Sequence, residues 1–271
     1  MESNKQKILD KIEYLEKNKL WDNEVEENPE SKTLKPEDVD YLDKKLSSKI
    51  LTRVSNYLAY NFFEKEIKKG NLIIKEINGS ENIKKVQGGA IVTCNHFSIY
   101  DHYAVFRAMR NEYGKKFRLY KVIREGNYSF PGLFGFFFKH CNTLPLSSNS
   151  ETLRNFLKAM KFFLERGKKI LIYPEQAMWR NYKKPRPFKE GAFKLAAKNN
   201  VPVIPCFITM EDTEKLDNDG FNIQAYTMWF LDPIYPDKEL SAKENAQIML
   251  EKNFEAVKKV YEKVYKIPLE Y

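Results

Sequence analysis

The sequence predicts an α/β protein: a mixed, largely parallel sheet flanked by helices, preceded by an N-terminal helical segment. Two observations predict this class. From residue 71 onward, short apolar runs bounded by turn residues alternate with stretches of helical spacing, the order that builds a parallel sheet with covering helices. Before residue 71 only helical spacing occurs. We therefore expect a helical segment over residues 1–70 and an α/β domain over residues 71–271.

The N-terminal segment is expected to hold two helices. Residues 6–19 carry apolar side chains at helical spacing, and a break at residues 28–31 precedes a second helical stretch over residues 36–69. Residues 50–63 of this second stretch form an apolar face with basic residues on its flanks. Such a helix suits a membrane surface. It equally suits packing on its own domain, which we favour.

Strands and helices are expected to alternate in the second part. The strands lie at residues 72–77, 90–94, 117–123, 169–173, 203–209 and 223–231. The helices lie after Asp101 and over residues 151–165, 188–198 and 242–266. The most apolar run, residues 130–138, is too short to cross a bilayer. It fits a short core helix better than an acyl-chain tunnel or a membrane contact.

The composition is that of a folded globular protein. The chain has 271 residues, of which 42% are hydrophobic and 14% aromatic, enough to bury a full core. It has no apolar run of about 18 residues and no signal-peptide pattern, so a cytoplasmic protein is expected. Cys94, Cys141 and Cys206 are widely spaced without a C-x-x-C pair, which argues against a disulfide framework or a zinc site.

The stretch from Asn95 to Asp101 carries the strongest chemical signal. It follows the apolar run 90–94 and contains His96 and Asp101. Residues five apart do not share a helical face, so these two side chains meet only if the chain bends between a strand and a helix. Ser98 and Asp101 also match the spacing of a helix capping box. The capping role and a catalytic role are compatible, because a carboxylate has two oxygens.

A histidine oriented by a carboxylate can act as a general base. Neutral imidazole takes a proton from an alcohol near pH 7, and the carboxylate stabilises the imidazolium that forms. If no serine intervenes, the substrate hydroxyl is itself the nucleophile. A less favoured alternative is a Cys94 thiolate paired with His96, because the two residues lie two positions apart on an extended strand.

The motif resembles the first motif of the glycerolipid acyltransferases, the family of 1-acyl-glycerol-3-phosphate acyltransferase. Residues 173–175, Tyr-Pro-Glu, resemble the start of the family's third motif, Phe-Pro-Glu-Gly-Thr-Arg, and residues 201–205 resemble its fourth, Val-Pro-x-x-Pro. Lys121 and the turn at 131–135 loosely resemble the second motif. That motif ends in an arginine, whereas residues 142–146 read Asn-Thr-Leu-Pro-Leu. The departure weakens the inference of a lysophosphatidic acid acceptor.

The resemblance implies an α/β fold like that of glycerol-3-phosphate acyltransferase and an O-acyltransferase activity in phospholipid biosynthesis or remodelling. His96 would be the base and Asp101 its partner, while Asn95, Lys121 and Glu175 would bind substrate. An acyl thioester, either acyl-coenzyme A or acyl-acyl carrier protein, would donate the acyl group to lysophosphatidic acid or a related lyso-glycerolipid. No bound cofactor and no metal are implied. The alternative is a catalytically silent protein that binds lipid or acyl carrier.

The charge distribution indicates an anionic partner. Residues 1–50 hold ten basic and thirteen acidic residues, whereas residues 51–271 hold 36 basic and 24 acidic ones. A basic body suits a phospholipid surface or a phosphorylated carrier. No nucleic-acid-binding motif is present, so we expect no nucleic acid partner. We expect a peripheral protein on the inner face of the cell membrane.

A basic loop follows the third motif. Arg180, Lys184 and Arg186 lie in it and are candidates to hold a phosphate in place of the missing arginines. A solvated loop without a ligand explains the same composition equally well.

Overall fold

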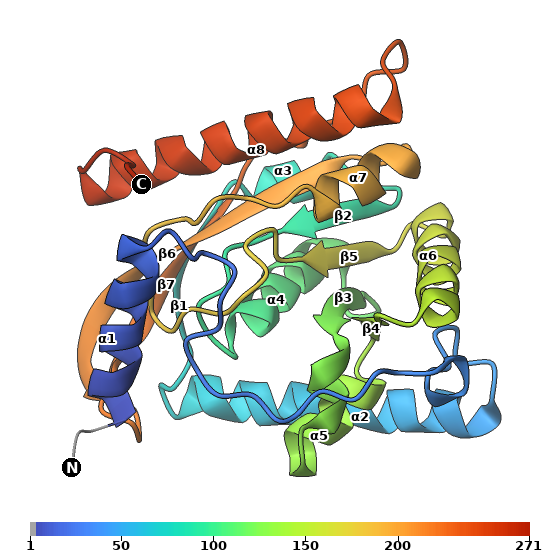
Figure 1. Cartoon of the computed structure of the whole chain (residues 1–271), viewed down its shortest axis with the longest axis horizontal. Coiled ribbons are helices and arrows are strands. Elements are labelled where there is room, and N and C mark those ends of the chain that lie inside the picture. Colours follow the sequence, from blue (N-terminus) through green and yellow to red (C-terminus); the bar gives the residue numbers. More distant parts are fainter. Residues whose placement is uncertain (1–3) are drawn as a thin grey trace.

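Seven strands form one mixed sheet within residues 4–271, the residues that our computed structural model describes (Figure 1). The strands are β1 (Ile73–Asn78), β2 (Ala90–Thr93), β3 (Leu119–Arg124), β4 (Thr143–Leu146), β5 (Lys169–Ile172), β6 (Val203–Leu216) and β7 (Asn222–Phe230). Their order is β1-β7-β6-β2-β5-β3-β4. Every neighbouring pair is parallel except β6 and β7. The prediction of a mixed, largely parallel sheet is confirmed.

Helices cover both faces of this sheet. They are α1 (Asn4–Lys17), α2 (Leu46–Lys68), α3 (Ser80–Lys84), α4 (Asp101–Tyr113), α5 (Gly132–His140), α6 (Ser150–Glu165), α7 (Gly191–Lys198) and α8 (Ala242–Tyr265). Two short 3₁₀ turns, η1 (Pro36–Asp38) and η2 (Glu125–Ser129), join them. None of the helices in the described part of the chain is both long and apolar enough to cross a membrane.

The side chains of strand β2 pack into two separate hydrophobic clusters. Ala90 and Val92 point into the cluster that α2, α3, α4 and α5 share, whereas Ile91 points into the cluster that α6, α7 and α8 share. Alternate side chains of a strand face opposite sides of a sheet, and all four residues of β2 are buried. This is why the central strand reads as a continuous apolar run.

Differences from the expected elements include a shorter helix and an additional strand. The helix expected over 36–69 begins only at Leu46, because the Asp40 carboxylate accepts hydrogen bonds from the backbone N–H groups of Lys44 and Lys45. Such local bonds compete with helix formation. Strand β4 was not expected, because it contains Pro145. β4 lies at the edge of the sheet, where a missing N–H is tolerated.

The apolar run 130–138 folds largely as helix α5, as favoured from the sequence. Phe137 is buried, and the ring of Phe134 packs edge-on against Phe62 of α2 at a centroid distance of 5.7 Å. The lower part of the molecule in Figure 1 is therefore a layer in which α2 and α5 pack together.

Candidate active site

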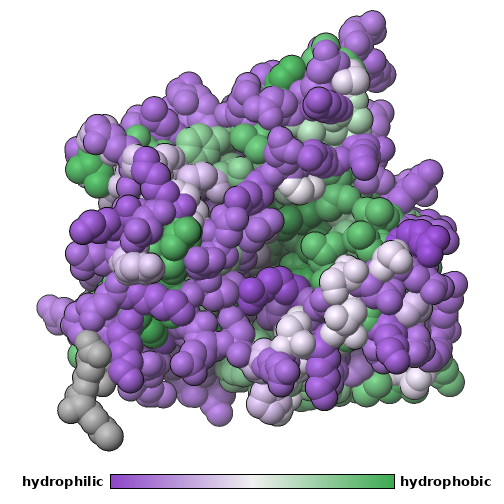
Figure 2. Space-filling view, in the orientation of Figure 1, coloured by the Kyte–Doolittle hydropathy of each residue, from purple (hydrophilic) through white to green (hydrophobic). Residues whose placement is uncertain are grey.

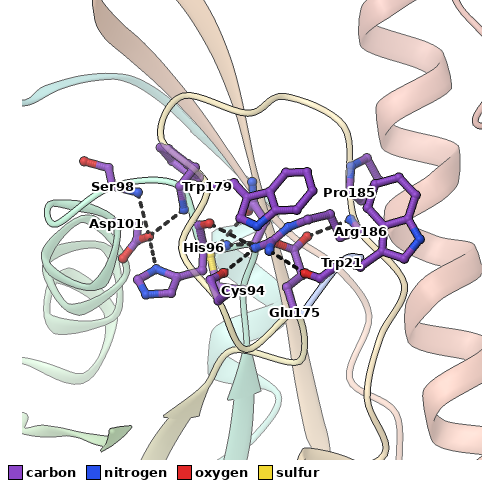
Figure 3. A network of polar contacts seen from close by, with 12 residues as sticks. Trp21, Cys94, His96, Ser98, Asp101, Glu175, Trp179, Pro185 and Arg186 are labelled. Carbon is purple, nitrogen blue, oxygen red and sulfur yellow. Dashed lines mark hydrogen bonds and ion pairs between the residues drawn. The ribbon is translucent and has the colours of Figure 1, made fainter. Parts of the chain in front are cut away.

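The chain bends between β2 and α4 and brings His96 against Asp101. The strand ends at Thr93, and Asp101 is the first residue of α4. His96 Nδ1 lies 2.8 Å from Asp101 Oδ2. Both residues lie at the carboxyl end of a central parallel strand, where α/β proteins commonly place their binding sites (Figure 3).

The carboxylate of Asp101 is fully buried and well supplied with donors. Oδ2 also accepts from the backbone N–H groups of Phe97, at 3.1 Å, and Ser98, at 3.2 Å, while the Tyr173 hydroxyl donates to Oδ1. Burial opposes ionisation of this carboxyl, but the charge and hydrogen bond of His96 and the bond from Tyr173 outweigh it and lower the pKa of Asp101. The carboxylate is therefore ionised at neutral pH, and Nδ1 of His96 carries the hydrogen.

The capping box is only partly formed alongside this pairing, because α4 begins after Tyr100 without a side-chain cap bond. The Ser98 hydroxyl accepts from the N–H of Tyr100 at 3.2 Å, and Asp101 reaches back to the N–H of Ser98. Asp101 thus both closes the turn before α4 and holds the imidazole. Residues of the motif that carries the pair therefore also form the turn that brings His96 and Asp101 together.

His96 presents its second ring nitrogen away from this bond. Its side chain is 22% exposed, and its ring stacks on the ring of Tyr173 with centroids 3.9 Å apart and planes 12° apart. With Nδ1 committed to Asp101, Nε2 is the atom that can take a proton from a bound hydroxyl.

Glu175 and Arg186 hold the backbone of His96. Glu175 Oε2 accepts from the His96 N–H at 3.1 Å, and Arg186 Nη2 donates to the His96 carbonyl at 3.3 Å. The N–H of Trp179 donates to the same carbonyl at 3.1 Å. The loop after β5 therefore fixes the peptide on which the imidazole is mounted (Figure 3).

This arrangement corrects two expectations. Glu175 was expected to orient acceptor hydroxyls, but its buried oxygens are taken by His96 and Arg186. Arg186 was expected to hold a phosphate, but it is buried, pairs with Glu175 and donates to the carbonyls of Trp21 and Ala177. Because Arg186 is 1% exposed, its guanidinium is not accessible to a phosphate ligand.

Arg180 and Lys184 are also paired within the protein. Arg180 bonds Asp217 at 2.6 Å and Asp219 at 2.8 Å. Lys184 bonds Glu16 at 2.8 Å. The structure contradicts the expected phosphate contact for both, because acidic residues distant in the sequence already neutralise these charges.

Asn95 forms hydrogen bonds within the protein, and Lys121 lines a cavity. The Asn95 amide is buried and forms two hydrogen bonds with the backbone of Ile208, at 3.0 and 2.9 Å. Its role is to join the end of β2 to β6, which corrects the expected role in substrate binding. Lys121 of β3 lines a small cavity together with His102.

The thiol alternative is contradicted by burial. Cys94 is 1% exposed, and its pKa is raised well above the usual value by burial and by the neighbouring Cys206. A thiolate is the reactive form of cysteine. Cys94 therefore stays a buried thiol near neutral pH. Within residues 4–271, no group of three or more His, Cys, Asp or Glu side chains is placed to hold a metal ion.

Sequence reasoning gave no role to Tyr173 or Trp21. Tyr173 contacts a carboxylate 72 positions earlier in the chain, and Trp21 stacks on Trp179 at a centroid distance of 5.7 Å. No short spacing signals such contacts. The exchange of the family's Phe for Tyr173 was the one visible hint.

Comparison with known proteins agrees with the geometry. The sequence profile of the family described as Acyltransferase matches residues 75–209, which include His96, Asp101 and Glu175. This chain belongs to the acyltransferase family. The match runs from β1 into β6, so it includes β2 and α4, which carry the pair, but not β7.

Two known proteins are similar to this chain. The chloroplastic 1-acyl-sn-glycerol-3-phosphate acyltransferase BAT2 of Brassica napus is 26% identical over 146 residues, which are 54% of this chain and 39% of that protein. The chain thus matches well under half the length of this relative. The crystal structure of the 1-acyl-sn-glycerophosphate (LPA) acyltransferase PlsC from Thermotoga maritima has a TM-score of 0.53 at 20% identity, covering 84% of this chain and 86% of that one. The two chains share their fold.

Proposed function

We propose that this acyltransferase moves a fatty acyl group from an acyl thioester to a hydroxyl of lysophosphatidic acid or a related lyso-glycerolipid. The observation that carries the proposal is the 2.8 Å bond between His96 Nδ1 and Asp101 Oδ2 at the carboxyl end of β2. The activities named for the Brassica and Thermotoga relatives agree with it. The donor would be acyl-coenzyme A or acyl-acyl carrier protein, and the product would serve phospholipid synthesis or remodelling.

The proposed reaction needs one base and no enzyme nucleophile. Nε2 of His96 takes the proton of the acceptor hydroxyl as its oxygen bonds to the thioester carbonyl carbon. The ionised Asp101 stabilises the imidazolium. The carbon–sulfur bond then breaks, and the imidazolium returns the proton to the leaving thiolate. The thiol and the acylated lipid are the products, and His96 is neutral again.

Thioester consumption with a panel of donors and acceptors tests this proposal. Purified protein is given acyl-coenzyme A or acyl-acyl carrier protein with phosphorylated and unphosphorylated lyso-lipids, and the acylated product is identified by mass. His96→Gln should lower the rate by about 10²- to 10⁴-fold, the usual contribution of a general base. His140→Gln is the matched control, because His140 lies on α5, and should leave the rate unchanged.

The outcome separates an enzyme from a silent binder. Product that forms equally well with His96→Gln would overturn the role of the pair. If no donor and acceptor combination gives product, while lyso-lipids still raise the melting temperature of wild type and His96→Gln alike, the protein is the binding protein considered above. The replaced residues Gln176, Ala177 and Met178 of the third motif are the feature that favours that alternative.

We also propose that α2 meets a membrane surface, which brings the enzyme to its lipid. One side of α2 packs on the domain through Ala59 and Phe63, as favoured from the sequence. Its other side exposes the apolar side chains of Leu46, Ile50, Leu51, Val54, Tyr57 and Leu58. Figure 2 shows hydrophobic surface along the lower right edge, where α2 runs in Figure 1.

The charges beside this exposed face favour an anionic membrane. Lys45, Lys49 and Arg53 are exposed next to it, and residues 44–63 include no acidic residue. Apolar side chains flanked by basic ones are the composition of a helix that lies in a membrane interface, and each basic residue near an anionic leaflet contributes about 1 kcal/mol. This surface supports a peripheral location on the inner face of the cell membrane.

A further inference from the structure

Tyr173 contacts both members of the pair at once. Its hydroxyl donates a hydrogen bond to Asp101 Oδ1, and its ring stacks on the imidazole of His96. We propose that Tyr173 is a positioning residue that sets the basicity of His96, its hydroxyl acting through Asp101 and its ring acting directly on the imidazole. This inference rests on the proposed function, in which His96 is the base.

The fold explains why Tyr173 reaches this place. Ile172, the last residue of β5, pairs with Thr93 of β2, so Tyr173 continues beside the residues that follow β2. Ile172 faces the α6 and α7 side of the sheet. Side chains alternate along an extended chain, so Tyr173 faces the opposite side, where it packs against the cluster that includes α4. Asp101 begins that helix.

The two carboxylate oxygens of Asp101 accept different numbers of hydrogen bonds. Oδ2 accepts three hydrogen bonds, from His96 Nδ1 and from the N–H groups of Phe97 and Ser98. Among residues 4–271, Tyr173 is the only donor to Oδ1. The carboxylate is inaccessible to solvent, so the Tyr173 hydroxyl decides how much of the negative charge is neutralised at Oδ1. Negative charge that the Tyr173 hydroxyl neutralises at Oδ1 is no longer available to stabilise the imidazolium of His96.

The hydroxyl is a permanent donor. Burial and the nearby Asp101 carboxylate raise the pKa of Tyr173 well above its usual value, so its proton stays in place across the working pH range. The family motif that this stretch resembles has Phe here, which supplies a ring but no hydroxyl. The hydrogen bond to Asp101 therefore distinguishes this chain from a sequence with that motif.

The ring and the hydroxyl have opposite effects on His96. The hydroxyl lowers the basicity of His96 by sharing the Asp101 charge. The ring face, stacked at 3.9 Å, favours the imidazolium through its negative quadrupole and holds the imidazole in one orientation. Tyr173→Phe removes the hydroxyl alone, and Tyr173→Leu removes both.

Other ionisable groups around the pair stay constant in this comparison. They include Cys94, Cys206, His102, Lys121, Glu175, Arg186 and Tyr226. Neither substitution at position 173 changes them, so a difference between Tyr173→Phe and Tyr173→Leu reports on the hydroxyl and the ring.

Proton NMR titration of the histidine ring signals tests the inference without any substrate. The chain has three histidines, so His96→Gln, His102→Gln and His140→Gln assign every signal. In Tyr173→Phe we expect the His96 titration midpoint to rise by about 0.5 to 1 pH unit, the size that one neutral hydrogen bond confers. In Tyr173→Leu we expect a smaller rise than in Tyr173→Phe.

Two outcomes would overturn the inference. One is a His96 midpoint in Tyr173→Phe that agrees with wild type while circular dichroism shows a folded chain. The other is equal midpoints for Phe and Leu, which would remove the role of the ring. Where acyl transfer is measurable, the acid limb of kcat/KM should move with the NMR midpoint. A protein without turnover would refute the proposed function, yet the titration would still decide the role of Tyr173.

Discussion

Glu175 and Arg186 form an ion pair that is almost fully shielded from solvent, with Oε2 and Nη2 2.8 Å apart and side chains 3% and 1% exposed. Both residues also bond the peptide of His96. The pair therefore joins the loop after β5 to the turn after β2. A substitution of either residue would disturb the backbone of His96, although neither side chain is exposed to solvent.

We predict that Glu175→Gln lowers the free energy of unfolding by about 3 to 5 kcal/mol, because it leaves the buried guanidinium of Arg186 without a compensating charge. Urea denaturation followed by circular dichroism measures this change. Lys183→Gln is the control. It breaks an exposed pair with Asp212, whose side chains are 34% and 58% exposed, and should cost less than about 1 kcal/mol. Equal losses for the two variants would show that the buried pair has no special structural role.

Gly135 provides a second prediction about stability. A Cβ at this position would overlap the backbone carbonyl of Phe130, so the turn before α5 must shift. We expect Gly135→Ala to lower the free energy of unfolding by about 1 to 3 kcal/mol, the usual cost of overpacking. Gly191→Ala serves as the control, because no heavy atom lies within 4 Å of its added Cβ. Alanine is the better helix former, so Gly191→Ala should be neutral or slightly stabilising in the same melts.

The sheet could be predicted because its strands carry a local signal. The strand β2, with Ala90, Ile91 and Val92 buried between two helical layers, reads as an uninterrupted apolar run. The bend that joins His96 to Asp101 also followed from local spacing, since the pair is five residues apart and cannot share a helical face. Strand β4 was not predicted. Its Pro145 is tolerated because β4 lies at the edge of the sheet, and which strand lies at the edge depends on how the whole sheet is assembled.

The surroundings of the pair could not be predicted, because their contacts are distant in sequence. The loop 180–186 looked available for a phosphate until folding brought Glu16, Asp217 and Asp219 against it. Likewise, nothing around Tyr173 indicates a partner 72 residues away. The sequence shows which charged residues are present, but only the fold shows which of them are paired within the protein.

His102 should make the protein sensitive to acid. Burial, aided by the charge of Lys121, lowers its pKa to about 3 from the model-peptide value of 6.5. Between these values the unfolded chain binds a proton that the folded chain does not, so the free energy of unfolding falls as the pH is lowered from 6.5 toward 3. One proton gives a slope of at most about 1.4 kcal/mol per pH unit.

His102→Gln should remove this contribution. Urea melts of wild type and variant at several pH values between 8 and 4 measure the difference. At pH 8 the difference reflects packing only, and it should move steadily in favour of the variant as the pH falls below 6.5. If wild type and variant differ by the same free energy of unfolding at pH 8 and pH 4, His102 gains its proton equally in the folded and unfolded states.

The proposed docking of α2 on a membrane predicts that substitutions on its exposed face weaken lipid binding. Val54 and Tyr57 are 43% and 69% exposed on that face, and transferring each into a membrane interface would contribute on the order of 1 kcal/mol or more. We expect Val54→Asp combined with Tyr57→Asp to weaken binding to vesicles of 30% anionic lipid at least tenfold in a sedimentation assay. Leu157→Asp is the matched control, because Leu157 is also 43% exposed but lies on α6, and it should bind as wild type does.

The basic flank gives an independent prediction for the same surface. Lys49→Glu with Arg53→Glu should weaken binding to anionic vesicles, leave any binding to neutral ones unchanged, and abolish most of the salt dependence, because each charge acts within a Debye length of about 10 Å at 0.1 M salt. If both double variants sediment with anionic vesicles as wild type does, α2 is not the docking helix. Loss of binding in the aspartate variants alone would show that apolar insertion, and not charge, holds the enzyme at the surface.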